Sequence, residues 1–225
     1  MVPDVDGVSF VTHDGVRLEG EARLDVAEPR GSAVICHAHP RHGGSKDHPV
    51  LWSLRNELSG GHGYLTLLFN FRGTMGSAGS YGGGRDEIRD VEAALGYVRG
   101  RAPSAPVLLA GWSFGASVAL RAAMRDERPA ALALIGLPLR PGDFELPAPP
   151  APEEVRRLRR PAIFVAGSED VYCPTGELRA YAASAGGQAR ILDGTDHYLW
   201  RREREAAVAI ADWSDGALSI DRADP

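Results

Sequence analysis

Short runs of consecutive apolar residues alternate along this chain with longer stretches of helical pattern. A continuous apolar run is typical of a parallel strand that helices cover on both faces. Such runs predict strands over residues 32–37, 63–71, 106–112, 130–136 and 161–167, with a weaker one over 189–192. Helical patterns separate them, over residues 47–59, 86–100, 114–126, 175–185 and 198–213. This alternation predicts an α/β fold with a mostly parallel, doubly wound sheet and right-handed crossovers.

Two segments depart from the alternation. Residues 8–12 and 16–24 flank His13-Asp14-Gly15, a turn triplet that predicts an N-terminal antiparallel hairpin. Residues 137–160 begin with a proline-rich stretch and show no second core. We therefore expect an irregular excursion over the sheet edge there, with minimal or no cap. No internal repeat is visible, so residues 1–225 are expected to form a single domain.

The composition is that of an ordinary globular protein of 225 residues, 44% of them hydrophobic and 24% charged. A chain of this length buries enough surface to form a core without cross-links. The net charge is −5, and 24 of the 25 basic residues are arginine, with Lys46 as the exception. Because no basic field is available to hold phosphate backbones, we expect neither nucleic acid nor an anionic membrane as a partner.

The chain start and the cysteines bear on the cellular location. Asp4 and Asp6 lie in a start that has no basic residues and no apolar h-region, so no secretory signal is expected. No run approaches the ~20 apolar residues that a membrane span needs. Cys36 and Cys173 are far apart and form no CxxC spacing, which favours a reducing compartment. We expect a cytoplasmic protein.

The strongest chemical motif is a serine between a predicted strand and a predicted helix. The run VLLAGWSFG carries an apolar strand directly into Gly111-Trp112-Ser113-Phe114-Gly115, and good helix formers follow at once. In a GxSxG turn, small residues two before and two after the serine let strand and helix pack closely. The turn lifts the hydroxyl above the carboxyl ends of the strands. The similar Ala78-Gly79-Ser80-Tyr81-Gly82 has no strand leading into it, so Ser113 is the predicted nucleophile.

A nucleophilic serine needs a base and an acid that orients the base, and in this architecture both follow the serine in sequence. His197 is the only histidine after Ser113, which makes it the predicted base. Two acidic residues, Glu169 and Asp170, follow the predicted strand 161–167. We assign Asp170 as the acid, because Glu169 would point elsewhere on a tight turn and Asp196 is too close to His197 in sequence.

An oxyanion hole needs two backbone N–H donors. The first is expected from Phe114, the residue after the nucleophile. The second is expected from the loop after the strand 32–37, where Pro40 has no N–H. His39 is the predicted donor there, and Arg41 is the alternative.

Together these segments resemble the α/β-hydrolase superfamily, in its small esterase and dienelactone-hydrolase-like branch. The resemblance covers about residues 8–212 and rests on HAHP with Gly43-Gly44, on FNFRG at 69–73, and on GWSFG, GSED and TDH. It implies an α/β-hydrolase fold, a triad of Ser113, Asp170 and His197, and oxyanion donors at His39 and Phe114. It also implies no metal and no cofactor, and a small or soluble acyl ester as the substrate.

Two other kinds of function fit parts of the sequence. His37, His39 and His42 approach the HxHxDH pattern of metal-dependent hydrolases, although Arg41 replaces the carboxylate and adds a cation. The fold could also be retained as a non-catalytic binding protein, although such proteins usually lose a triad member. The glycine-rich run 73–84 lacks the lysine of a phosphate-binding loop and is interpreted as a flexible loop near the site.

Overall fold

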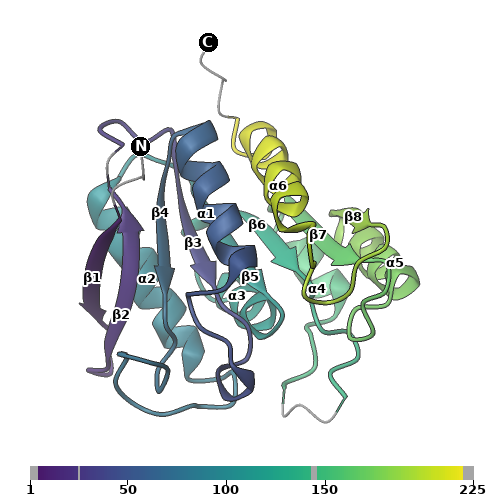
Figure 1. The fold of residues 1–225 in the computed structure, drawn as a ribbon, viewed down its shortest axis with the longest axis horizontal. Coiled ribbons are helices and arrows are strands. Elements are labelled where there is room, and N and C mark those ends of the chain that lie inside the picture. The colour runs from purple at the N-terminus through teal and green to yellow at the C-terminus, as the bar shows by residue number, and fades with distance from the viewer. Residues whose placement is uncertain (1–4, 25, 143–145, 220–225) are drawn as a thin grey trace.

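A single eight-stranded sheet runs through the molecule (Figure 1). The computed structural model describes residues 5–24, 26–142 and 146–219. The strands are β1 Asp6–Val11, β2 Arg17–Arg23, β3 Gly31–Cys36, β4 Tyr64–Phe69, β5 Val107–Trp112, β6 Pro129–Ile135, β7 Ala162–Gly167 and β8 Gln188–Leu192. Their spatial order is β1-β2-β4-β3-β5-β6-β7-β8. The β1–β2 hairpin and the β2–β4 pair are antiparallel and all other pairs are parallel, which confirms the predicted fold class.

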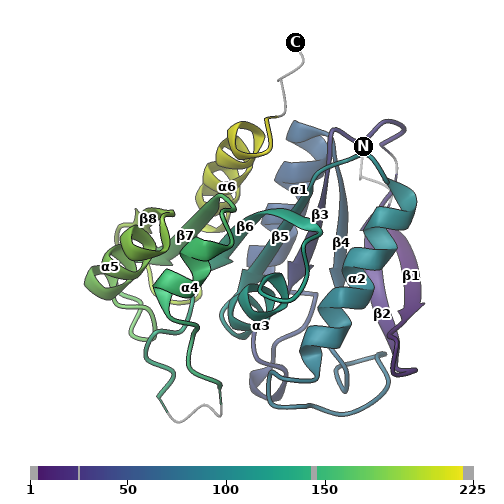
Figure 2. The ribbon, with the colours of Figure 1, turned by 180° about the vertical axis from the view of Figure 1, so that it is seen from behind.

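Helices cover both faces of the sheet (Figures 1 and 2). The helices α1, Pro49–His62, and α6, Glu203–Ala217, lie on one face. The opposite face carries α2, Glu87–Arg101, α3, Phe114–Ala123, and α5, Thr175–Ala185. This double cover explains why the central strands are continuous apolar runs rather than alternating ones. None of the helices in the described part of the chain is long and apolar enough to cross a membrane.

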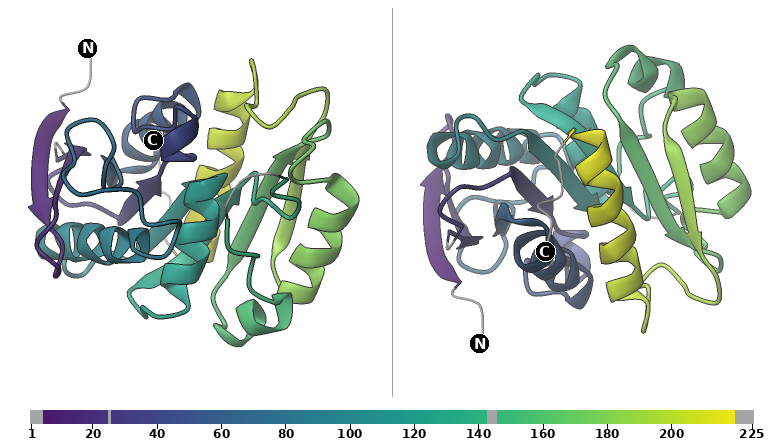
Figure 3. Two further views of the ribbon diagram at one scale, coloured as in Figure 1. Left: turned by 90° about the horizontal axis from the view of Figure 1, so that it is seen from below. Right: turned by 90° about the horizontal axis from the view of Figure 1, so that it is seen from above.

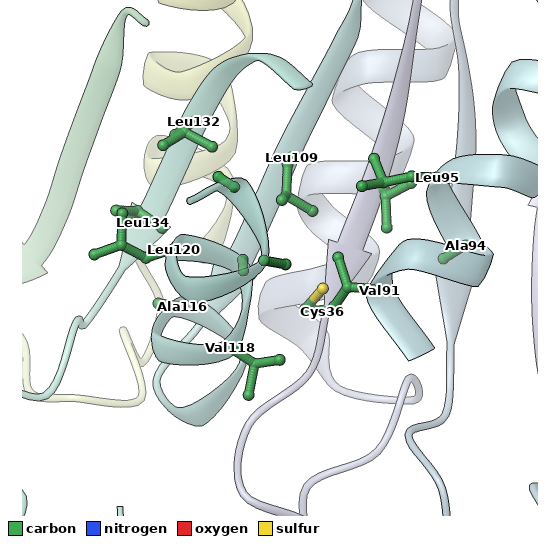
Figure 4. Close-up of a cluster of buried hydrophobic side chains, with 14 of the residues drawn as sticks. Cys36, Val91, Ala94, Leu95, Leu109, Ala116, Val118, Leu120, Leu132 and Leu134 are labelled. Carbon is green, nitrogen blue, oxygen red and sulfur yellow. The ribbon is translucent and has the colours of Figure 1, made fainter. Parts of the chain in front are cut away.

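The helix that follows the candidate serine is held almost entirely inside the core. Leu109, Leu132 and Leu134 of the sheet pack against Ala116 and Leu120 of α3 (Figure 4). Of the ten residues of α3, nine are buried. Because its start cannot shift without disturbing this packing, the turn that precedes α3 has a fixed position.

The parallel strands β3, β4 and β5 run downward in Figure 1, so the loops that follow them lie at the lower end of the molecule. The left view of Figure 3 shows this end face on. In open α/β sheets, ligands bind outside the carboxyl ends of the strands. The predicted site residues all lie in loops or turns that follow β3, β5, β7 or β8.

Two helix predictions need correction. The last helix was expected from residue 198 but begins at Glu203, because Leu199 and Arg201 have φ values of 55° and 62° and cannot belong to a helix. The excursion 137–160 is not wholly irregular, since it contains a short helix, α4, Pro152–Arg157. Pro152 occupies its first turn, where the missing N–H breaks no helical hydrogen bond.

A buried ion pair joins the loop after β4 to α2. The Arg72 N–H donates to Asp90 Oδ2 at 2.9 Å, and Arg72 Nε donates to Asp90 Oδ1 at 2.9 Å. Arg72 also reaches Asp14 in the β1–β2 turn at 3.0 Å. Burial raises the pKa of Asp90 to about 6, and its bonds to Arg72 counteract that rise. Arg72 thus ties three separate segments together.

We expect Arg72→Met to lower the free energy of unfolding by about 3–5 kcal/mol, because it leaves the fully buried Asp90 without its counter-charge. The double variant Arg72→Met/Asp90→Leu should recover much of that loss, since it removes the unpaired charge as well. Urea unfolding of the three proteins measures both effects. A double variant no more stable than the single one would show that the loss comes from packing instead.

Candidate active site

Ser113 lies on a strained turn between β5 and α3. Its φ and ψ are 55° and −116°, a conformation that non-glycine residues rarely adopt. The turn is fixed by a hydrogen bond from the Ser113 N–H to the Ile135 carbonyl, at 2.8 Å. A Cβ on Gly111 would lie 2.3 Å from the Gly115 carbonyl oxygen, and one on Gly115 would lie 2.3 Å from that of Cys36. Both glycines of the GxSxG motif are therefore required for the packing.

The structure brings the three predicted triad residues into one hydrogen-bonded chain. His197 Nε2 lies 2.9 Å from Ser113 Oγ, and His197 Nδ1 lies 2.8 Å from Asp170 Oδ2. The Asp170 side chain is fully buried. Its second oxygen accepts the backbone N–H groups of Tyr172 at 2.9 Å and Cys173 at 3.0 Å. Both oxygens are thus engaged, so the carboxylate is held in one orientation toward the imidazole.

The other two acids of these loops point elsewhere. Glu169 is exposed, and its backbone N–H donates to the Thr195 carbonyl at 3.0 Å. Asp196 Oδ1 accepts the N–H of Tyr198 at 2.9 Å, which closes a local turn. The loops after β7 and β8 also touch directly, because a Cβ on Gly167 would lie 2.2 Å from the Thr195 carbonyl oxygen. This close approach delivers His197 to Asp170.

Gly136, at the end of β6, is a site residue that the sequence analysis did not single out. Its φ is 54°, and a Cβ there would lie 2.9 Å from Cε1 and 3.1 Å from Nδ1 of His197. Trp112 fixes the same residue from another side, since its Nε1–H donates to the His197 carbonyl at 3.1 Å. A glycine directly after an apolar strand was visible in the sequence, but nothing there showed that an imidazole fills the space beside it.

The loop after β3 is tied down by neutral histidines. His37 Nε2 accepts the Phe71 N–H at 3.0 Å, and its Nδ1–H donates to the Ala38 carbonyl at 2.6 Å. His39 Nδ1 accepts the Arg41 N–H at 3.2 Å, so its Nε2–H donates to the Tyr81 hydroxyl at 3.0 Å. Burial lowers the pKa of both imidazoles to about 4, which keeps them neutral near pH 7.

These contacts bear on two open alternatives. The Arg41 N–H already bonds the His39 ring, which leaves His39 as the better candidate for the second oxyanion donor. Both ring nitrogens of His37 and of His39 are engaged within the protein, so a metal ion would have to displace these bonds. Among the described residues, no group of three or more His, Cys, Asp or Glu side chains is arranged to hold a metal.

A cavity of about 220 Å³ opens at Ser113. Its walls come from the loop after β3, from Trp112 and His197, and from Leu146, Tyr172 and Tyr198. Half of the Tyr198 side chain is exposed at its rim. The cavity is thus largely aromatic, and it places Ser113 and the predicted oxyanion loop on the same enclosed volume.

Comparison with known proteins agrees with this geometry. Residues 31–222 match the family model of the alpha/beta hydrolase domain. The chain belongs to the alpha/beta hydrolase family. This assignment confirms the superfamily expected from GWSFG, GSED and TDH, and it supports a hydrolase activity.

Three relatives place this alpha/beta hydrolase more closely. It is similar to a serine hydrolase without lid from Xanthomonas campestris, at 26% identity and a TM-score of 0.79, over 100% of this chain and 99% of that one. A serine hydrolase homologue from Coxiella burnetii is 25% identical, with a TM-score of 0.77 over 91% and 96% of the two chains. An uncharacterized protein of Rickettsia prowazekii is 28% identical over 202 residues, 88% of this chain and 84% of that protein.

We expect Gly136→Ala to lower kcat/KM for p-nitrophenyl acetate by about 10- to 100-fold, because the new methyl group pushes the His197 ring away from Ser113. Gly142→Ala is the matched control, since Gly142 also has a positive φ, 60°, but no atom within 4 Å of the added carbon. Equal losses in the two variants would contradict the steric explanation.

The buried His37 should make stability depend on pH. Its pKa falls from the ordinary 6.5 to about 4 on folding, so the unfolded chain takes up a proton that the folded one refuses. Stability from this group is complete above pH 6.5 and is lost as the pH falls toward 4, by about 2–4 kcal/mol. In urea unfolding across this range, His37→Gln should start less stable at pH 7.5 but show a shallower decline. An unchanged decline would refute the assignment to His37.

Proposed function

We propose that this protein is a single-domain serine hydrolase of the carboxylesterase type, which cleaves a small or soluble ester through an acyl-enzyme. The observation that carries the proposal is the unbroken hydrogen-bonded chain from Asp170 through His197 to Ser113 Oγ. Its opening into a cavity beside the oxyanion loop gives the attacking oxygen room for a substrate. The description of the Xanthomonas and Coxiella relatives as serine hydrolases supports the same chemistry.

In the proposed mechanism, Ser113 Oγ attacks the ester carbonyl while His197 Nε2 takes up the hydroxyl proton. Asp170 accepts the His197 Nδ1–H, which keeps Nε2 directed at the serine and stabilises the imidazolium that forms. His197 then gives the proton to the leaving alcohol as the tetrahedral intermediate collapses to the acyl-enzyme. A water molecule, activated by the same imidazole, releases the acid and restores Ser113.

The backbone N–H groups of Phe114 and His39 are proposed to stabilise the oxyanion. Phe114 begins α3, so its N–H lies at the positive end of the helix dipole. The contact of Gly115 with the end of β3 holds both donors on one rigid frame. The mechanism uses no cofactor and no metal. The small catalytic cavity, without an extensive cap above it, favours short or soluble acyl groups over long lipid chains.

A fluorophosphonate probe tests the proposal directly. We expect one covalent adduct on the wild-type protein and none on Ser113→Ala, measured by intact mass. Ester hydrolysis should fall by about 10⁴-fold or more in that variant while its unfolding transition is retained.

Ser80→Ala is the matched control, because Ser80 stands in the second glycine-flanked serine motif and is exposed. It should keep both the adduct and the activity. A folded wild-type protein that forms no adduct would overturn the serine mechanism and favour a binding protein on a hydrolase fold.

A further inference from the structure

A second cavity, of about 560 Å³, is surrounded by arginine side chains at the ends of α2 and α3. Arg85 and Arg89 line it from the α2 side, and Arg121 and Arg125 from the α3 side. Within the described residues, Arg85 and Arg125 have no carboxylate within ion-pair distance. Arg121 donates to the carbonyl of Ala148, and its Nε is buried without a partner.

The charge of this arginine cavity is not balanced by its own walls. Asp86 is the one acidic residue in the lining, and it pairs with Arg89 at 2.9 Å. Three guanidinium groups therefore remain uncompensated, in a protein whose net charge is −5. Burial and the positive charges of Arg125 and Arg85 lower the pKa of Arg121, which shows that these groups repel one another. A bound anion would relieve this repulsion.

The arginine cavity adjoins the catalytic cavity. Leu146 lines the catalytic cavity and also an intermediate one of about 400 Å³, whose walls include Pro147 and Arg85. Those two residues line the arginine cavity in turn. A Cβ on Gly84 would lie 3.4 Å from both the Phe114 ring and Pro147, so the arginine cavity begins beside the residue that follows Ser113. A chain of modest length attached to an ester at Ser113 therefore points toward the arginines.

We propose that the arginine cavity binds an anionic group, a carboxylate or a phosphate, at the far end of the ester that Ser113 cleaves. Guanidinium groups suit this role because they bind both anions with two parallel hydrogen bonds. The inference rests on the proposed function and narrows it to esters whose acyl or alcohol chain ends in an anion. Arg85 and Arg125 are then specificity residues, while Arg121 also anchors the segment that carries Leu146.

Paired substrates test the specificity. The p-nitrophenyl half-esters of adipate, suberate and sebacate differ from p-nitrophenyl hexanoate, octanoate and decanoate by a terminal carboxylate. At one chain length we expect kcat/KM to favour the anionic ester by about tenfold or more, and the preference to shrink as salt is added. Arg85→Gln/Arg125→Gln should abolish the ratio. Arg179→Gln, which removes an exposed charge on α5 outside all three cavities, should keep it.

A binding measurement separates this inference from the proposed function. Calorimetry on the wild-type protein should detect adipate or hexyl phosphate, the tighter of the two identifying the anion, with binding lost in Arg85→Gln/Arg125→Gln. An anionic preference that survives in the double variant would overturn the proposal, as would the absence of any preference. If no ester is cleaved and Ser113 takes no probe, the serine mechanism fails, and the calorimetric result alone decides the arginine cavity.

Discussion

The site depends on three backbone segments that approach as closely as atoms allow. At Gly115 the start of α3 presses against the carbonyls of Cys36 and His37, and at Gly111 the strand before the serine presses against the helix after it. No side chain fits at either position. The loop after β3 and the Ser113 turn therefore share one rigid frame, and the groups meant for an oxyanion are positioned by main chain alone. The positive φ of Ser113 is strain that the buried α3 holds in place.

Around this frame, buried polar side chains hold the loops in place and bind no ligand. Glu87 is fully buried, and it accepts the N–H groups of Gly82 at 2.7 Å and Gly84 at 2.8 Å. His37 joins the loop after β3 to the loop after β4 by using both of its ring nitrogens. A pattern that looks like a metal motif in sequence is thus a set of neutral hydrogen-bonding side chains. The glycine-rich run has a defined conformation for the same reason.

The sequence was sufficient for the features that rest on local pattern and chain order. Apolar runs located the strands, and His197 was assigned because no other histidine follows Ser113. What it could not provide depends on contacts between distant segments. The last helix starts late because residues 198–202 turn tightly to deliver His197, although their composition would suit a helix. Gly136 looked like an ordinary strand end, since only the folded chain shows the imidazole beside it. Arg85 and Arg125 are 40 residues apart in sequence, and only the packing of α2 beside α3 brings them together.

A site with a minimal cap must select its substrate by fixed walls. Closing lids let an enzyme couple recognition to assembly of the active site, whereas an open cleft discriminates by the contacts it already offers. The catalytic cavity is small and mostly aromatic, so by itself it discriminates poorly among short acyl groups. Charge is the stronger means, because an electrostatic contact at the far end of a substrate separates molecules whose reacting ends are identical. In a protein of net charge −5 the general field repels anions, and at physiological salt it is screened within about 8 Å. Arginines must therefore adjoin the cleft to attract an anionic ester, and that is where the unpaired ones lie.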